Sequence, residues 1–193
     1  MKRGNGQKSY LIDTIGIDHL GGKWVEMSRC GVKCRILPYK MTATETKPPV
    51  YYNSCYRPVV DEKRRVQIPA KWRSGGDESF TLILWPSGGR QAGHLLVLPP
   101  EPMAALVAKL KAMPYSDPTT ETLRRLLGKN SDQVVLDKGG RICLPEAMAK
   151  AVGIQETAVL QGLFDRFEIW SPERYDETSA VDEAFSSKAF ALI

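Results

Sequence analysis

The sequence predicts a mainly β fold with additional helices, an α+β architecture built from two tandem copies of one small unit. Three observations predict it: a nine-residue motif that occurs twice, β-type alternation around each motif, and helical spacing between the copies. At 193 residues the chain is long enough for two small fused units, each with a modest core.

The repeated motif is the clearest signal in the chain. Residues 61–69 (DEKRRVQIP) and 137–145 (DKGGRICLP) share an Asp, an Arg, two aliphatic positions and a Pro, all 76 residues apart. Downstream, residues 95–101 (LLVLPPE) parallel residues 167–173 (FEIWSPE) at a separation of 72. The four-residue difference indicates an insertion in the first copy, near 86–93. Similarity at a fixed offset is typical of duplicated supersecondary units.

Each copy is predicted to run strand, turn, strand, short helix, strand, strand. Apolar runs enter the motif at Val59–Val60 and Val134–Leu136, and apolar residues alternate after it, so each motif forms a hairpin with one buried face. Pro69 and Pro145 lack a backbone N–H and suit a first helical turn, so each strand is expected to end there. The next strands are expected at 80–85 and 158–163, and the glycines that end the short helices are Gly75 and Gly153.

Helices are predicted between the copies. Apolar residues from Met103 to Met113 lie at helical spacing after Pro102, and a second helix is expected from Thr119 to Leu127, ended by Gly128. We expect these helices to pack against the β units or against a neighbouring subunit. The predicted division is an N-terminal extension at 1–50, a first unit at 55–102, a helical connector at 103–131, a second unit at 132–175 and an acidic C-terminal tail at 176–193.

The N-terminal extension has a different character from the rest. Residues 1–50 show no clear amphipathic period and end in a Thr-, Lys- and Pro-rich stretch. We hypothesise that translation starts at Met41 and that the upstream segment is disordered or a product of gene misassignment.

Residues 1–40 hold eight Lys or Arg against three acidic residues, so they account for the whole net charge of +5. A case for nucleic acid therefore rests on local clusters, of which 57–73 is one, with six basic residues against two acidic ones.

The sequence also indicates the cell compartment in which the protein is expected. No apolar run approaches the roughly 20 residues of a membrane span, and the first residues lack the pattern of a secretory signal. We therefore expect a cytoplasmic protein. The four cysteines, Cys30, Cys34, Cys55 and Cys143, are too few and too scattered for a disulfide framework and are expected to be reduced thiols.

The repeated loop has a definite chemistry. In the pattern Asp-x-x-x-Arg, the carboxylate can accept the backbone N–H groups of the turn and pair with the guanidinium four residues later. Arg65 and Arg141 would then point in a fixed direction, with Lys63 on the same solvent side as Arg65. A fixed guanidinium suits phosphate and the O6/N7 edge of guanine. A single such pair would be interpreted as a turn-stabilising ion pair; its repetition in the same register favours function.

These residues carry a family resemblance. The two motifs, residues 126–132 (LLGKNSD), and the stretch from Gly153–Ile154 through 160–170 (LQGLFDRFEIW) are similar to the bacterial MraZ family. The similarity runs from about Ser54 to Glu177 and is most specific in the second copy. It implies two AbrB-like swapped-hairpin units that form one pseudo-symmetric barrel with connecting helices. It also implies a transcriptional regulator, expected to be a repressor, that acts without cofactor as a ring-shaped homo-oligomer.

The resemblance also implies a partner and a location. The expected partner is double-stranded DNA, in short direct repeats upstream of the regulator's own operon, the division and cell-wall gene cluster, so the protein is expected to be nucleoid-associated. The family's D-x-K-G-R loop falls on Asp61, Lys63 and Arg65, and on Asp137, Gly140 and Arg141. The DNA-binding residues are therefore expected to be Lys63, Arg64, Arg65, Lys138 and Arg141, oriented by Asp61, Asp137 and Gly140.

Both loops depart from the family pattern. Arg64 stands where the pattern has glycine, so a position that can require positive φ carries a Cβ at some cost. Gly139 stands where lysine is common, which leaves Lys138 as the only nearby ammonium in the second loop. We therefore expect the first loop to contribute more to DNA affinity.

Other residues of the chain could suggest a metal site or an enzyme. Cys30, Cys34, Cys55 and His19 could supply zinc ligands, but their spacing is irregular and no metal site is expected. With only two histidines, a Ser/His/Asp arrangement has no credible base, so no enzyme is expected. Two rivals to a DNA-binding regulator stay open: an antitoxin-like protein whose acidic tail neutralises a toxin, and an oligomeric scaffold without DNA binding.

Overall fold

The structure is a computed structural model that describes residues 12–17, 23–27, 33–35, 49–75, 78–87 and 89–192. The chain divides into two compact units, residues 1–46 and 47–193. The first unit contains a three-stranded antiparallel sheet of β1 (Ile12–Ile17), β2 (Lys23–Met27) and β3 (Lys33–Arg35). These strands differ from the lack of regular structure expected for 1–50. Met41 lies outside the described residues, so translation from that position stays a prediction.

The second unit mixes antiparallel sheets with four α-helices among its described residues, in agreement with the predicted α+β class. The larger sheet has six strands in the order β4-β10-β11-β7-β6-β8. A separate two-stranded ribbon joins β5 to β9. The strands are β4 (Cys55–Tyr56), β5 (Arg65–Gln67), β6 (Ser79–Ser87), β7 (Arg90–Leu98), β8 (Ser131–Val135), β9 (Arg141–Cys143), β10 (Val159–Gly162) and β11 (Phe167–Trp170).

Strands from the two halves of this unit interleave. Apart from the hairpins β6–β7 and β10–β11, every ladder joins a strand of residues 55–98 to one of residues 131–170: β4 to β10, β6 to β8, β7 to β11 and β5 to β9. Each half therefore completes the sheet of the other. Neither half has a full set of strand partners by itself, so the two are expected to fold together.

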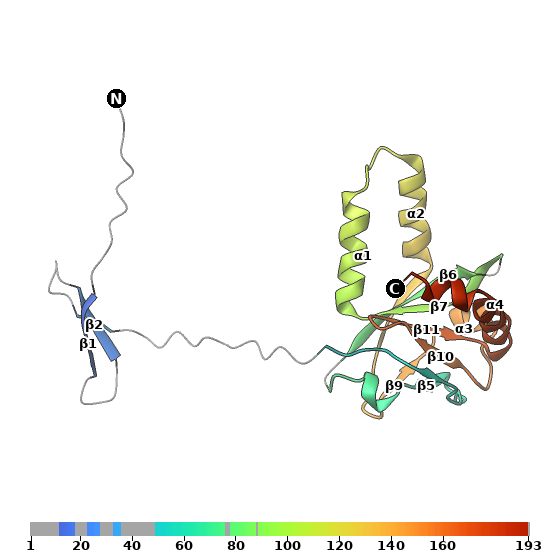
Figure 1. The fold of residues 1–193 in the computed structure, drawn as a ribbon, viewed down its shortest axis with the longest axis horizontal. Coiled ribbons are helices and arrows are strands. Elements are labelled where there is room, and N and C mark those ends of the chain that lie inside the picture. The colour runs from blue at the N-terminus through green and yellow to red at the C-terminus, as the bar shows by residue number, and fades with distance from the viewer. Residues whose placement is uncertain are drawn as a thin grey trace. The chain divides into compact units, whose positions relative to one another are not determined.

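The barrel expected from the sequence is wrong for the described strands. The six-stranded sheet is open, with β4 and β8 as its two outer strands. The physical reason is that the chain leaves both outer strands for an Asp-containing turn and enters β5 or β9. These two strands pair with each other, so the edges of the sheet do not meet. Figure 1 shows the ribbon on one side of the sheet and the helices α1 and α2 on the other.

The main core lies between the sheet and the ribbon. Alternate residues of the central strands are buried on this face, among them Leu82, Val97 and Ile169, and they pack with Val66 and Ile142 of the ribbon. Aromatic rings fill the end of the core, where Trp72 lies 5.1 Å from Phe167 between ring centroids. Alternation in the strands therefore sets the buried face, as the sequence predicts.

Short helical segments follow each ribbon strand. The 3₁₀ turn η1 (Ala70–Trp72) follows Pro69, and helix α3 (Glu146–Val152) follows Pro145. Gly153 ends α3, as the sequence predicts, with φ 78. The first copy makes only a 3₁₀ turn whose C-cap is Arg73, so the expected end at Gly75 comes two residues too late.

The connector forms a helical hairpin of α1 (Pro100–Ala112) and α2 (Pro118–Lys129) (Figure 1). Met103, Leu106 and Leu127 cover the outer face of the sheet. The Asp117 carboxylate caps α2 by accepting the backbone N–H groups of Thr119 and Thr120. The expected end at Gly128 is one residue short of the last helical residue, because Gly128 does not adopt positive φ and Asn130 forms the C-cap.

The C-terminal segment is helical. Helix α4 (Pro172–Phe190) covers most of the predicted acidic tail and has no buried residue. In the described part of the chain, no helix combines the length and the apolar character needed to cross a membrane.

The buried centre of the ribbon should dominate its stability. Val66 is fully buried, whereas Val59 is 74% exposed. We predict that Val66→Ala lowers the free energy of unfolding by about 2 kcal/mol, through lost burial and the cavity left behind. The matched change Val59→Ala should cost less than about 0.5 kcal/mol. Urea unfolding of both variants checks this, and equal losses would contradict the central position of the ribbon.

Candidate nucleic-acid interface

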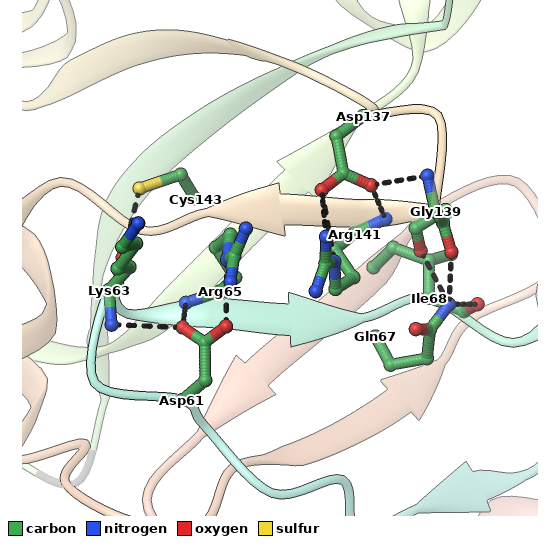
Figure 2. Close-up of polar contacts among 10 residues, drawn as sticks. Asp61, Lys63, Arg65, Gln67, Ile68, Asp137, Gly139, Arg141 and Cys143 are labelled. Carbon is green, nitrogen blue, oxygen red and sulfur yellow. Dashed lines mark hydrogen bonds and ion pairs between the residues drawn. The ribbon is translucent and has the colours of Figure 1, made fainter.

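The β5–β9 ribbon brings the two repeated loops together. Arg65 pairs with Cys143, Val66 with Ile142 and Gln67 with Arg141. Paired residues share a face of the ribbon, and the faces alternate along each strand. Val66 and Ile142 therefore point into the core, and the residues of the other two pairs point outward. Figure 2 shows Arg65 and Arg141 next to each other on the outer face, although they are far apart in the sequence.

In the first loop, the Asp61 carboxylate closes the turn and holds the arginine. One oxygen, Oδ1, accepts the backbone N–H of Lys63 at 3.0 Å and that of Arg65 at 2.9 Å. The other, Oδ2, accepts Nε–H of Arg65 at 2.7 Å. One side chain therefore fixes both the backbone of the turn and the direction of its guanidinium.

The second loop repeats this arrangement. Asp137 Oδ1 accepts the backbone N–H of Gly139 at 2.8 Å and that of Arg141 at 2.9 Å. Asp137 Oδ2 accepts Nε–H of Arg141 at 2.9 Å and also lies 2.9 Å from Nη2. The hydrogen bonds that the sequence predicts for Asp-x-x-x-Arg are thus present in both copies (Figure 2).

These contacts leave the arginines partly open to solvent. The side chains of Arg65 and Arg141 are 32% and 35% exposed, so neither lies inside the core. Hydrogen bonds from the backbone of Arg65 lower the pKa of Asp61, and those from the backbone of Arg141 lower the pKa of Asp137. The guanidinium side chain of each arginine acts in the same direction. Both carboxyl groups are therefore charged acceptors over the physiological range.

The glycine position of the loop requires a left-handed backbone. Gly140 has φ 77, and Arg64 at the matching position has φ 59. A Cβ on Gly140 would also meet the guanidinium of Arg73, so a side chain there needs both a left-handed backbone and a displaced Arg73 side chain. The first loop carries its side chain at the expected backbone cost.

Arg64 differs in direction from the other expected DNA-binding residues. Its Nε donates to the backbone O of Leu144 at 3.3 Å, and its Nη1 lies 3.7 Å from Glu146. The side chain therefore turns toward the start of α3. Lys63 and Lys138 are both exposed, one in each loop, although they occupy different positions of the motif.

Sequence reasoning missed three residues of this surface. Gln67 donates through Nε2 to the carbonyl O of Gly139 at 3.0 Å and of Gly140 at 2.9 Å, and so holds the second loop. Cys143, at the same motif position, donates weakly through Sγ to the carbonyl O of Lys63 at 3.3 Å. Their alternation with the buried residues indicated exposure, but only the pairing of β5 with β9 places each on the other loop.

Arg73 is the third missed residue. Its Nε and Nη2 donate to the carbonyl O of Ile68 at 2.9 and 2.6 Å, which places its guanidinium against Gly140. No pattern in the motif indicated this contact, because the matching position of the second copy is Ala149.

The described residues contain no group of three or more His, Cys, Asp or Glu side chains arranged to hold a metal ion. Cys55 and Cys143 are free and exposed. Of the zinc ligands considered from the sequence, His19 and Cys30 lie outside the described residues.

Comparison with known proteins identifies the family. The chain is 37% identical over 137 residues to the transcriptional regulator MraZ of Herpetosiphon aurantiacus, across 71% of this chain and 90% of that protein. This chain belongs to the MraZ family. MraZ of Acetivibrio thermocellus is 30% identical over 136 residues, 70% of this chain and 91% of the relative. MraZ of Desulfitobacterium hafniense is 30% identical over 140 residues, 72% and 94% of the two chains.

A family model described as "MraZ protein, putative antitoxin-like" matches residues 128–191. This range contains the second loop and α4. The resemblance predicted from the motifs is therefore confirmed, and the second copy is again its most recognisable part. The matches to the MraZ relatives extend over more than twice this length.

A side chain at Gly140 should destabilise the second loop. We predict that Gly140→Ala lowers the free energy of unfolding by about 1–2 kcal/mol, mainly from positive φ, with a smaller cost for moving the Arg73 side chain. As a control, Gly128→Ala adds a Cβ that meets no atom within 4 Å in α2, and should raise stability by up to about 1 kcal/mol. Thermal and urea unfolding measure both changes; a neutral Gly140→Ala would refute the loop geometry.

The loop carboxylates should make stability depend on acid pH. Their folded pKa values lie below the ordinary value of 3.8, so the unfolded chain binds more protons. Their stabilisation is complete well above pH 3.8 and is lost as pH falls through the lower folded values. The double variant Asp61→Asn, Asp137→Asn should show a smaller acid-side loss than the unmodified chain. Urea unfolding between pH 7 and pH 3 tests this, and parallel curves would contradict it.

Proposed function

We propose that this MraZ family member is a sequence-specific DNA-binding transcriptional regulator that acts as a repressor and is not an enzyme. The observation that carries the proposal is the pair of carboxylate-oriented arginines on one face of the β5–β9 ribbon. Arg65 and Arg141 each use Nε on an aspartate, and Arg141 Nη2 also lies 2.9 Å from Asp137. Both outer nitrogens of Arg65 and Nη1 of Arg141 therefore remain for a partner. The names of the relatives support transcriptional regulation.

The ribbon suits DNA in shape and chemistry. A two-stranded β-ribbon can enter the major groove, where a guanidinium can donate two hydrogen bonds to guanine O6 and N7. Lys63 and Lys138 are exposed beside the arginines and can contact phosphate. Each oriented Asp–Arg pair is nearly neutral, so the lysines and Arg64 supply the excess positive charge that attracts the duplex.

We infer that the two copies are AbrB-like swapped-hairpin units related by a pseudo-two-fold axis. Support comes from the ladders, because the register of β5 and β9 is centred on Val66 and Ile142, which are equivalent in the repeat. The register of β7 and β11 is centred on Leu96 and Glu168, which are equivalent in the downstream part of the repeat, where the copies are 72 residues apart. The strand order also reads the same from both ends when equivalent strands are exchanged.

The proposed regulator acts as a homo-oligomeric ring in the cytoplasm, associated with the nucleoid and without cofactor. It binds short direct repeats in the promoter region of its own operon, which contains division and cell-wall genes. Many weak ribbons in one ring gain avidity on repeated sites without a larger surface on any one chain. Exposed apolar residues on α2 and α4, including Leu126 and Phe185, support contacts between subunits.

An antitoxin-like role is the second candidate. The description of the matching family model names it, and α4 exposes Val181, Phe185 and Phe190 beside acidic residues. In this alternative the ribbon binds DNA and α4 binds a toxin. An oligomeric scaffold without DNA binding is the third candidate. Unlike the regulator and the antitoxin-like protein, a scaffold would form no complex with DNA at low salt.

Removing either arginine should weaken operator binding. We predict that Arg65→Ala and Arg141→Ala each reduce affinity for the chain's own upstream DNA by roughly tenfold or more, because a bidentate contact contributes about 1–3 kcal/mol. The loss should be larger for Arg65→Ala, in the more basic loop. The control Arg125→Ala removes an exposed guanidinium from α2 and should leave affinity unchanged.

Gel shifts over a salt series measure these effects, since specific binding weakens as salt rises. Equal losses for the two arginine variants would contradict the ranking of the loops. Unchanged binding in both would overturn the assignment of the ribbon to DNA.

A further inference from the structure

The outer face of the six-stranded sheet has two halves of different character. Under α1 and α2 it is apolar, with Ile83, Leu96 and Leu98 buried against the helices. Beyond the β7–β11 ladder it becomes polar, because Glu168 pairs with Leu96 and so shares its face. Helix α4 covers this polar half, where the Tyr175 hydroxyl donates to Gln161 Oε1 at 2.8 Å.

A cavity of about 490 Å³ lies between the polar half and α4. The side chains that matter for its chemistry are His94, Gln161, Glu168, Trp170, Tyr175 and Asp182. Its size falls in the range of small-molecule sites in proteins. The proposed DNA-binding ribbon contributes none of the described residues that line it.

His94 is buried here with an unsatisfied nitrogen. Its side chain is only 5% exposed and stacks on Trp170 with 4.1 Å between ring centroids. Its Nε2 lies 3.2 Å from Glu168 Oε1, but in the described part of the chain neither ring nitrogen makes a hydrogen bond of good geometry. The hydrogen-bonding capacity of this buried ring is therefore unsatisfied.

The cavity is also negatively charged. Burial opposes ionisation of Glu168, but the interaction with His94, the hydrogen bond from Trp170 and the charge of Arg166 outweigh it, so the pKa of Glu168 is lowered. Asp182 on α4 adds a second carboxylate. No Lys or Arg is found among the described side chains that line the cavity. Carboxylates and aromatic rings therefore line the cavity, and Arg57 lies over the Tyr175 ring, 5.6 Å from its centroid.

We propose that this cavity binds a small organic amine, whose ammonium group lies between Glu168 and Asp182. An ammonium has three donors and no acceptor, which matches the carboxylate oxygens of Glu168 and Asp182. The carbon chain of the amine packs against Trp170 and Tyr175, whose ring faces favour a neighbouring cation. The bound amine contacts both the sheet and α4, and so fixes the helix on the sheet. This role is independent of DNA binding.

The test uses the full chain without DNA and 1,4-diaminobutane as the probe. We expect saturable binding, measured by calorimetry, a rise in melting temperature, and a shift of the Trp170 indole N–H signal in NMR spectra. Butyrate, with the same carbon chain and opposite charge, should do none of these. Asp182→Asn should weaken diamine binding roughly tenfold, the loss of one charge-assisted hydrogen bond.

The matched control is Glu183→Gln, which removes the same charge from the next residue of α4, outside the cavity. It should leave the affinity for the diamine unchanged. Both residues are exposed, so both variants are expected to fold. Absence of saturable binding would overturn the proposal, and so would equal weakening by the two variants, which would indicate general attraction to the acidic helix.

Discussion

The antiparallel pairing of β5 with β9 is the constraint on which the rest of the molecule depends. Each strand has only three residues, and the central pair of Val66 and Ile142 is fully buried. Burial of this pair fixes the register, since a slip of one residue would turn the core positions outward. The same register places Arg65 and Arg141 on one outer face. Core packing and the geometry of the candidate interface are therefore set by the same ladder.

The two loops share a design but differ in how they are held. An aspartate orients an arginine in both. The second loop has glycine at the left-handed position, and its carbonyl groups accept from the amide of Gln67. The first loop has Arg64 there and is held across the ribbon by the thiol of Cys143, a weak donor, and by the hydrogen bond from Arg64 Nε to the carbonyl O of Leu144. The first loop is thus the more basic of the two.

Much of this arrangement could be predicted from the sequence. The spacing of 76 residues indicated a duplicated unit, Asp-x-x-x-Arg predicted the hydrogen bonds of the turn, and a glycine aligned with Arg64 indicated positive φ there. These features are local, and short-range chemistry determines them. The family resemblance, carried by the same motifs, is confirmed by the comparisons with MraZ relatives.

Features that depend on distant partners could not be predicted in the same way. Alternation shows which face of a strand is buried but not which strand lies beside it, so an open sheet was expected to be a barrel. The contacts of Gln67 with the second loop and of Arg73 with Gly140 follow from that pairing. Likewise, nothing in the sequence around His94 indicates that residues of β11 and α4 lie beside it.

The most direct test of the central claim uses two natural cysteines. Cys143 lies on the outer face of the ribbon, and Cys55 is exposed on β4. Their alkylation rates can be followed separately by peptide mass spectrometry, with and without saturating DNA from upstream of the chain's own coding sequence. If the ribbon contacts DNA, the duplex should slow alkylation of Cys143 several-fold and leave Cys55 unchanged. An undiminished rate at Cys143 in the saturated complex would contradict the account.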